Sequence, residues 1–171
     1  MIKIIKKKKY YRCSRCHKNV GQDETCIIDN ETICVACIYG KHKPFKIYPI
    51  GLVKNELTRA KKGFGVAGKE GISRIELLDS QKPFLYKLEE EKNITVVYYL
   101  HEANAVKSVF NRGLEGKKVG VFASRTPCRL SKIGIQDVRL IKREEATLYV
   151  TGLDAINGTP VLDIKMKWSF L

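Results

Sequence analysis

Two Cys-x-x-Cys pairs constrain the N-terminal part of this chain more than any other feature. The first pair is Cys13 and Cys16, and the second, Cys34 and Cys37, follows after seventeen intervening residues. Each pair can bend into a knuckle that presents two sulfur atoms on one face, and two facing knuckles supply the tetrahedral ligand set of Zn²⁺. Four protein ligands leave no open position for a substrate, so the predicted zinc site is structural.

The residues between the two pairs predict a small β-hairpin. Thr25–Ile28 and Glu31–Ile33 flank Asp29-Asn30, which are turn residues, and a zinc ribbon carries its second knuckle on such a hairpin. Cys26 is expected to be a small buried apolar residue of the hairpin rather than a ligand. His17 follows Cys16 directly and is not expected to reach the same ion, because consecutive residues rarely ligate one metal.

The start of the chain and its cysteine usage indicate a reducing compartment. Five of the six cysteines lie between Cys13 and Cys37, and the opening sequence MIKIIKKKKYY lacks the apolar core of a signal peptide. No apolar run approaches the length of a membrane span. We therefore expect a cytoplasmic protein, not attached to a membrane, whose cysteines bind metal rather than form disulfides.

The formal net charge of +14 suggests a polyanionic partner. Residues 1–46 hold eleven Lys and Arg against four acids, and the remainder holds twenty-one against fourteen, so each part carries +7. Nucleic acid is the first candidate and an anionic membrane the second, while a Lys-rich solvated surface is the alternative. The N-terminal residues expected to contact RNA are Lys6, Lys7, Lys8, Lys9, Arg12 and Arg15. A protein-docking role for the ribbon stays open.

From Ile47 onward the pattern predicts an all-β domain. Short β-branched segments are separated by Gly, Pro or charged turns, and seven such segments without a long helix favour a barrel or a sandwich. The predicted strands are Ile47–Val53, Ile72–Leu78, Ile94–Leu100, Lys118–Ala123, Ile133–Ile141, Ala146–Thr151 and Val161–Lys165. Helical turns are expected at Gln81–Lys92 and Ala103–Asn111. We place the basic N-terminus and ribbon in residues 1–46, with a linker near Tyr39–Lys46, and the barrel in residues 47–171.

The glycine-rich loop Gly63–Gly71 contains two phosphate-binding patterns, and neither has the required context. Its GxGxxG needs a strand before it and a helix after it, whereas a polar run precedes it and a strand follows. Its GxxxxGK is followed by Glu70 where a P-loop needs Ser or Thr for Mg²⁺. The segment is therefore predicted to be a flexible loop that is neither a dinucleotide-binding motif nor a P-loop.

Two segments carry a family resemblance: KVGVFASRTPCRLSKIG, which begins at Lys118, and GLDAINGTPVLDIK, which begins at Gly152. They resemble the TrmO-type (YaeB/TsaA-like) S-adenosylmethionine-dependent tRNA adenosine N6-methyltransferases, whose pattern reads VGVFATRSPFRPNPIG and then LDxxDGTPVLDIKPY. The resemblance covers Ile47 to Lys165. It implies a TrmO-like β-barrel, a homodimer, and methylation of N6 of threonylcarbamoyladenosine next to the tRNA anticodon.

The resemblance also implies which residues contact the methyl donor. A His follows the corresponding strand in the family, at the donor site, and an Arg and a turn before the last strand hold the donor's polar ends. The implied donor-binding residues are Gly68, Lys69, Glu70, His101, Glu102, Arg125, Asn157, Gly158, Thr159 and Pro160. Gly68, Lys69 and Glu70 depart from the family's Arg-Gln-Pro pattern.

The chain departs from the family pattern on the side expected to face RNA. Where the family reads Arg-Pro-Asn-Pro, this chain has Arg129-Leu130-Ser131-Lys132, which replaces a stiff loop by a basic, flexible one. Arg129 and Lys132 therefore join the residues expected to contact RNA. No general base is assigned. The alternatives to a tRNA methyltransferase are a non-catalytic S-adenosylmethionine-binding protein that binds or senses RNA, and a zinc-dependent adaptor.

Overall fold

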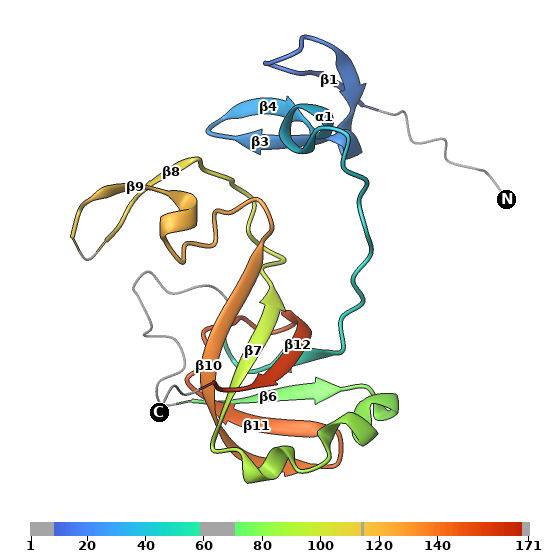
Figure 1. Ribbon diagram of the computed structural model, residues 1–171, viewed down its shortest axis with the longest axis vertical. Coiled ribbons are helices and arrows are strands. Elements are labelled where there is room, and N and C mark those ends of the chain that lie inside the picture. Colours follow the sequence, from blue (N-terminus) through green and yellow to red (C-terminus); the bar gives the residue numbers. More distant parts are fainter. Residues whose placement is uncertain (1–8, 59–70, 114, 169–171) are drawn as a thin grey trace, which may run out of the picture. The chain divides into compact units, whose positions relative to one another are not determined.

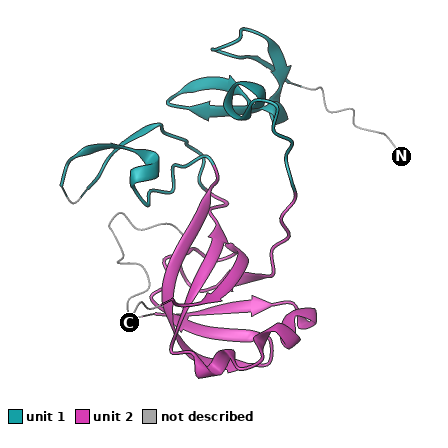
Figure 2. Ribbon diagram, in the orientation of Figure 1, with its two compact units in different colours: residues 1–45, 103–130 teal, residues 46–102, 131–171 magenta. Residues whose placement is uncertain are grey.

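The computed structural model describes residues 9–58, 71–113 and 115–168 (Figure 1). The chain divides into two compact units (Figure 2). Unit 1 comprises Met1–Phe45 and Ala103–Leu130, and unit 2 comprises Lys46–Glu102 and Ser131–Leu171. The cysteine-rich N-terminus is thus grouped with a segment that lies between two strands of unit 2.

Unit 2 is a closed antiparallel barrel, which confirms the predicted all-β fold. The strands follow the order β10-β11-β6-β5-β12-β7 around the barrel, and β7 closes it by pairing with β10. Their bounds are β5 Gly51–Lys54, β6 Ile72–Leu77, β7 Asn93–Tyr99, β10 Ile133–Glu144, β11 Thr147–Thr151 and β12 Pro160–Met166. Six of the seven predicted strands are therefore barrel strands.

Alternating side chains of these strands fill the barrel, as expected for strands with one buried face. In β7, Ile94, Val96 and Tyr98 point inward, and between them lie more exposed residues. The remaining buried residues of this core are Val53, Ile75, Leu85, Val138, Leu140, Leu148, Val150, Leu153, Ala155 and Val161. The barrel thus has an apolar core of its own.

Between β6 and β7 the chain forms two short 3₁₀ turns. They are η2, Asp79–Leu85, and η3, Leu88–Glu90, in the region where a helical turn was expected. Pro83 lies inside η2, and a proline lacks the N–H that a longer α-helix would need at this point. Lys82 of η2 pairs with Glu145 at 2.9 Å and Asp79 at 3.3 Å.

The N-terminal part of unit 1 forms two hairpins and a helical turn. Its elements are β1 Tyr10–Arg12, β2 Asn19–Gly21, η1 Gln22–Glu24, β3 Thr25–Ile28, β4 Glu31–Cys34 and α1 Val35–Tyr39. The predicted hairpin is confirmed by β3 and β4, which pair across Asp29 and Asn30. Both turn residues have positive φ, 49° and 67°, as a two-residue hairpin turn with right-handed strand twist requires.

The second part of unit 1 corrects two expectations. Ala103–Asn111 is not helical: its end forms β8, Val109–Asn111, which pairs with β9, Lys118–Gly120. The predicted barrel strand Lys118–Ala123 is shorter and lies in this hairpin, because the 3₁₀ turn η4, Val121–Ala123, follows Gly120. Val121 is buried, but Phe122 is 79% exposed, so the apolar run does not serve as a core strand.

Across the described ranges, the helical segments are too short or too polar to span a lipid bilayer.

Candidate functional site

The four cysteines of the two Cys-x-x-Cys pairs form one cluster, as predicted. Their sulfur atoms all lie within 4.8 Å of one another. The Sγ atoms of Cys13 and Cys37 are 3.9 Å apart, and those of Cys16 and Cys34 are 3.7 Å apart. A regular tetrahedron with Zn–S bonds of about 2.3 Å has sulfur atoms about 3.8 Å apart. The sulfur geometry therefore fits a tetrahedral metal site and is far too open for disulfides.

Backbone groups of both knuckles point at the sulfur of Cys13. The N–H groups of Arg15 and Cys34 donate to Cys13 Sγ at 3.4 and 3.3 Å. Backbone N–H groups, first that of Cys16 and then that of Cys34, lower the pKa of the Cys13 thiol to about 6. Neighbouring sulfur atoms, led by that of Cys34, and burial raise the pKa of Cys37 to about 12. A bound cation would hold the Cys37 side chain as a thiolate at neutral pH.

Gln136 of β10 binds the second of the two segments that carry the family resemblance. Its Nε2 donates to the carbonyl oxygen of Gly152 at 2.5 Å, and the N–H of Asp154 donates to its Oε1 at 2.8 Å. Both ends of one side-chain amide thus hold the segment that leads into the Asn157–Pro160 turn. Sequence reasoning missed Gln136, although a lone amide in the apolar run IGIQDV is a signal that could have found it.

The turn at Asn157–Pro160 is anchored on the end of β5. The N–H of Asn157 donates to Leu57 O at 2.7 Å, and the N–H of Gly158 donates to Val53 O at 2.8 Å. Gly158 has φ of 81°, a conformation that favours glycine. Asn157 is exposed and Thr159 is buried. The backbone of the turn is therefore fixed, and the side chain of Asn157 is presented to solvent.

Asn55, which follows β5, supports the same turn. Its Nδ2 donates to Ala155 O at 2.8 Å and to Ser73 Oγ at 3.0 Å, while its own N–H donates to Asn157 Oδ1 at 3.3 Å. One side chain therefore joins β6 to the segment before the turn. Asn55 was not among the residues singled out from the sequence.

His101 follows β7 and has an unsatisfied ring nitrogen. Its Nδ1 is buried and has no hydrogen-bond partner within the part of the chain that the structure describes. Buried polar atoms normally have a partner, so this nitrogen fits a ligand contact. Glu102, the next residue, is exposed. The role expected for His101 stays a prediction.

Asp154 and Tyr98 are two titratable residues of unit 2, and the charge of the first affects the second. Asp154 is half-buried, and burial raises the pKa of its carboxyl group. Burial and then the negative charge of Asp154 raise the pKa of the Tyr98 hydroxyl to about 12. Tyr98 is thus a neutral phenol at physiological pH, and its hydroxyl is available as a hydrogen-bond donor.

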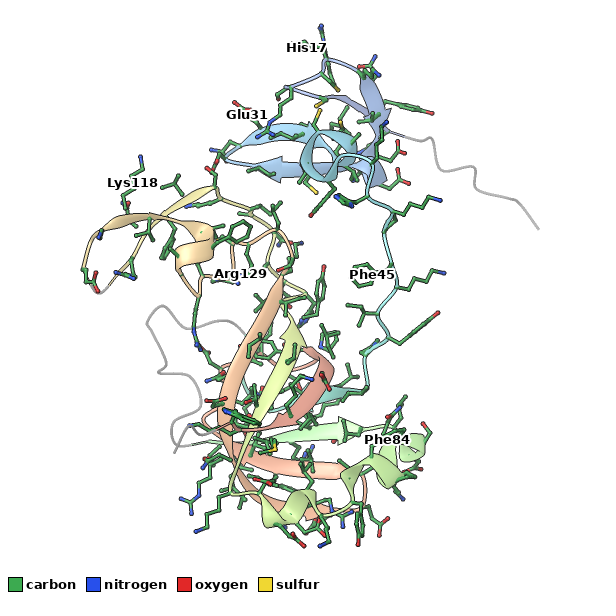
Figure 3. The ribbon with its side chains drawn as sticks, viewed as in Figure 1. His17, Glu31, Phe45, Phe84, Lys118 and Arg129 are labelled. Carbon is green, nitrogen blue, oxygen red and sulfur yellow. The ribbon has the colours of Figure 1, made fainter. Side chains whose placement is uncertain are left out.

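The two arginines of the first segment differ in their contacts within unit 1. Arg129, marked in Figure 3, donates from Nε to Thr126 O at 3.1 Å and from Nη2 to the carbonyl oxygens of Val121 and Ser124. Arg125 is exposed and makes no hydrogen bond or ion pair with any residue in the described ranges. Arg129 therefore shapes the loop, whereas the guanidinium of Arg125 is available to a ligand.

The other predicted site residues are distributed over both units. His101, Glu102, Lys132 and the Asn157–Pro160 turn belong to unit 2, while the two arginines belong to unit 1. Lys9, Arg12 and Arg15 lie in the exposed first hairpin of unit 1 and the residue before it. The remaining expected contacts lie outside the described residues: Lys6, Lys7, Lys8, Gly68, Lys69 and Glu70. These assignments stay predictions.

Comparison with known proteins identifies a family. Residues 65–169 match the family "tRNA-methyltransferase O N-terminal domain". A protein of Pyrococcus abyssi named probable S-adenosyl-L-methionine-binding protein is 32% identical over 119 residues, which are 68% of this chain and 65% of that protein. The mouse tRNA (adenine(37)-N6)-methyltransferase is 36% identical over 95 residues, which are 54% of this chain and 22% of that protein.

The crystal structure of TrmO from Pseudomonas aeruginosa is similar in fold as well as in sequence. It superposes with a TM-score of 0.59 at 27% identity, over 74% of this chain and 57% of that one. The chain therefore spans less than two thirds of each of these three proteins.

Proposed function

This chain belongs to the tRNA-methyltransferase O N-terminal domain family, and from that membership we propose that it is an S-adenosylmethionine-dependent tRNA methyltransferase. The observation that carries the proposal is the match of residues 65–169, which includes both segments with the family pattern. The proposed reaction is N6-methylation of threonylcarbamoyladenosine next to the anticodon. The proposed enzyme is a cytoplasmic homodimer with a ribbon in residues 1–46 and the methyltransferase domain in residues 47–171.

The residues proposed to hold the donor offer the contacts that its polar groups need. The free guanidinium of Arg125 suits the donor's carboxylate, and a charge-assisted pair of this kind is strong. The unpaired Nδ1 of His101 and the anchored turn Asn157–Pro160 supply further polar contacts. Glu102, Gly68, Lys69 and Glu70 complete the proposed set.

When bound, S-adenosylmethionine would supply a methyl group activated by its sulfonium: the acceptor nitrogen would bond to the methyl carbon as the S–C bond breaks, S-adenosylhomocysteine would leave, and the nitrogen would lose its proton. The protein's part in such a reaction is alignment and polar contact rather than strong acid catalysis. Gln136 and Asn55 serve alignment, because their side-chain amides bond to the backbone at Gly152, Asp154 and Ala155. Rigid support of this kind holds the donor-binding turn in one geometry.

For the cysteine cluster we propose one structural Zn²⁺ per chain, held by Cys13, Cys16, Cys34 and Cys37. The sulfur separations support zinc because they match a tetrahedron of thiolates. The metal would supply much of the folding free energy of the ribbon, because its apolar cluster is small: Cys13, Ile33 and Cys34, with Val20, Ile28, Cys37 and Ile38 against them.

A second candidate is a non-catalytic S-adenosylmethionine-binding protein that binds or senses RNA. It is favoured by the Arg129–Lys132 loop, which lacks both prolines of the family pattern. The zinc-dependent adaptor is a third reading, with no donor bound at all. Calorimetry with S-adenosylmethionine separates the adaptor from the other two, and transfer of labelled methyl to unfractionated tRNA separates the enzyme from the binding protein.

A further inference from the structure

The positive charge of this protein is concentrated in unit 1. Unit 1 holds sixteen Lys and Arg against five Asp and Glu, a net charge of +11, whereas unit 2 holds sixteen against thirteen, a net charge of +3. A Zn²⁺ ion with four thiolates would lower the charge of unit 1 by two. The asymmetry arises because the segment Ala103–Leu130 contributes six cations and one acid.

The cations of unit 1 are also less neutralised by neighbouring acids. In unit 2, Lys82 pairs with Glu145 at 2.9 Å and Arg143 with Glu89 at 3.1 Å, among several such pairs. In the described part of unit 1 the ion pair is that of Arg112 with Glu115. Lys118 extends away from the β8–β9 hairpin (Figure 3). Unit 1 therefore presents unpaired cations to solvent, as a surface that binds phosphates does.

A specific contact joins the ribbon to the Ala103–Leu130 segment within unit 1. The N–H of Asp29 donates to Val106 O at 3.0 Å, and Ile28 forms a parallel bridge with Val106. The Asp29 carboxylate accepts from the N–H of Ser108, at 3.1 and 3.2 Å to its two oxygens, and from the Ser108 hydroxyl. One turn residue of the ribbon thus binds the other segment through both backbone and side chain.

The Ala103–Leu130 segment relays this contact to the loop that carries Arg125. The N–H of Val121 donates to Ser108 O at 3.0 Å, and the N–H of Lys107 donates to Cys128 O at 3.0 Å. Val121 O in turn accepts from Arg129. A continuous set of hydrogen bonds therefore runs from Asp29 through Ser108 to the two ends of the loop.

We propose that the ribbon and the Ala103–Leu130 segment form a single RNA-binding arm. In this arm Asp29 is the positioning residue that holds the two parts in a fixed arrangement. The identification of the polyanion as RNA rests on the proposed function. A carboxylate in so basic a unit would repel phosphate groups, so its presence suggests another role. The Asp29 carboxylate accepts hydrogen bonds from Ser108, which gives it a structural role. Donation from the Ser108 hydroxyl and then its N–H lowers the pKa of this carboxyl group, so the contact persists at neutral pH.

The test compares two acids of the ribbon in the full-length protein. Asp29→Gly removes the carboxylate and keeps a residue that tolerates the positive φ of this turn. The matched control, Asp23→Ala, removes an exposed acid of η1 that is recorded in no ion pair among the described residues. Both substitutions raise the net charge by one. Electrostatics alone predicts slightly tighter binding of unfractionated tRNA in both.

The proposal predicts that the two variants differ in their affinity for tRNA. Asp29→Gly weakens tRNA binding about tenfold despite its higher charge, whereas Asp23→Ala binds as tightly as the wild type or tighter. Affinity for S-adenosylmethionine is unchanged in Asp23→Ala. Amide hydrogen exchange of residues 106–113 and 115–129 is faster in Asp29→Gly, and Asp29→Asn, which keeps one acceptor oxygen, partly restores the wild-type rate.

Ser108→Ala removes the hydroxyl that binds Asp29 and leaves the sequence of the ribbon unchanged. If Asp29→Gly loses its metal, Ser108→Ala is therefore the variant that tests whether the contact supports tRNA binding. Equal or tighter tRNA binding by Asp29→Gly and Ser108→Ala, with unchanged exchange in both, would overturn the proposal. The exchange measurement needs neither RNA nor methyl transfer. A wild-type protein that binds tRNA without methylating it would refute the proposed enzyme and leave the arm intact.

Discussion

The ring of Tyr98 lies directly over the α-carbon of Gly134. The two residues are paired in register on β7 and β10, and a Cβ on Gly134 would come within 2.4 Å of Tyr98 Cε2. The glycine that follows the Arg129–Lys132 loop therefore leaves room for the aromatic ring in the barrel. Tyr98 is 7% exposed, so its ring has little freedom to move aside.

Gly134→Ala is accordingly expected to destabilise the barrel. Overpacking of this kind costs about 1–3 kcal/mol, and thermal unfolding followed by circular dichroism should show a lower midpoint. Gly120→Ala is the control, because a Cβ at Gly120 meets nothing within 4 Å and the residue has φ of −62°. Equal midpoints for Gly134→Ala and the wild type would show that the ring is not held over the glycine.

Gln136→Ala is expected to loosen the segment before the donor-binding turn. Two hydrogen bonds to the backbone of Gly152 and Asp154 are lost, which costs about 1–3 kcal/mol of unfolding free energy. If the turn holds the donor, calorimetry should also show weaker binding of S-adenosylmethionine. Gln81→Ala, which changes a half-buried glutamine of η2, should leave both quantities unchanged. Similar effects of the two substitutions would remove the special role of Gln136.

The sequence predicted the barrel well because its strands have strong local signals. Ile72–Leu77 and Asn93–Tyr99 combine β-branched residues with alternating burial. The first ends one residue earlier than predicted, and the second is shifted by one residue at both ends. Lys118–Ala123 has the same apolar composition, yet Gly120 and a 3₁₀ turn end its strand early. Composition alone does not show whether the residues of an apolar run are buried. Phe122, for example, belongs to such a run and is exposed.

The cysteine cluster could be predicted because ligand spacing is encoded locally, whereas long-range side-chain contacts could not. Asp29 and Ser108 are 79 residues apart, and Asn55 and Ala155 are 100 apart. The sequence near Asp29 predicts a turn. It does not indicate a partner in the Ala103–Leu130 segment. Only the structure shows that this segment groups with the ribbon, and therefore that the positive charge is concentrated in unit 1.

Removal of a cysteine ligand is expected to release the metal and unfold the ribbon. Metal analysis of the wild type should give about one zinc per chain, and Cys13→Ser or Cys34→Ser should lose it, because metal binding supplies the folding free energy of so small a module. The barrel should keep its thermal transition. Cys26→Ser, in the same hairpin and outside the cluster, is the control and should retain zinc. A wild-type protein purified under reducing conditions without metal would contradict the assignment.

Arg125→Ala is expected to weaken donor binding. Loss of a charge-assisted contact with the donor's carboxylate costs about 1.5–3 kcal/mol, or about ten- to a hundredfold in affinity. Arg125 is exposed and shapes no part of its loop, so the fold should not change. Lys118→Ala removes another exposed cation of unit 1 and should leave the affinity unaltered. Calorimetry with S-adenosylmethionine on both variants measures this, and an equal loss in both would show that general charge is responsible.

The most direct test of the central claim is methyl transfer to tRNA. The full-length protein is incubated with labelled S-adenosylmethionine and unfractionated tRNA, and the nucleosides are then separated and identified by mass. The account predicts time-dependent label in N6-methylated threonylcarbamoyladenosine, and about ten- to a hundredfold slower labelling when Arg125→Ala is assayed at donor concentrations well below the wild-type dissociation constant. A protein that binds both S-adenosylmethionine and tRNA, yet transfers no label to any nucleoside, would contradict it.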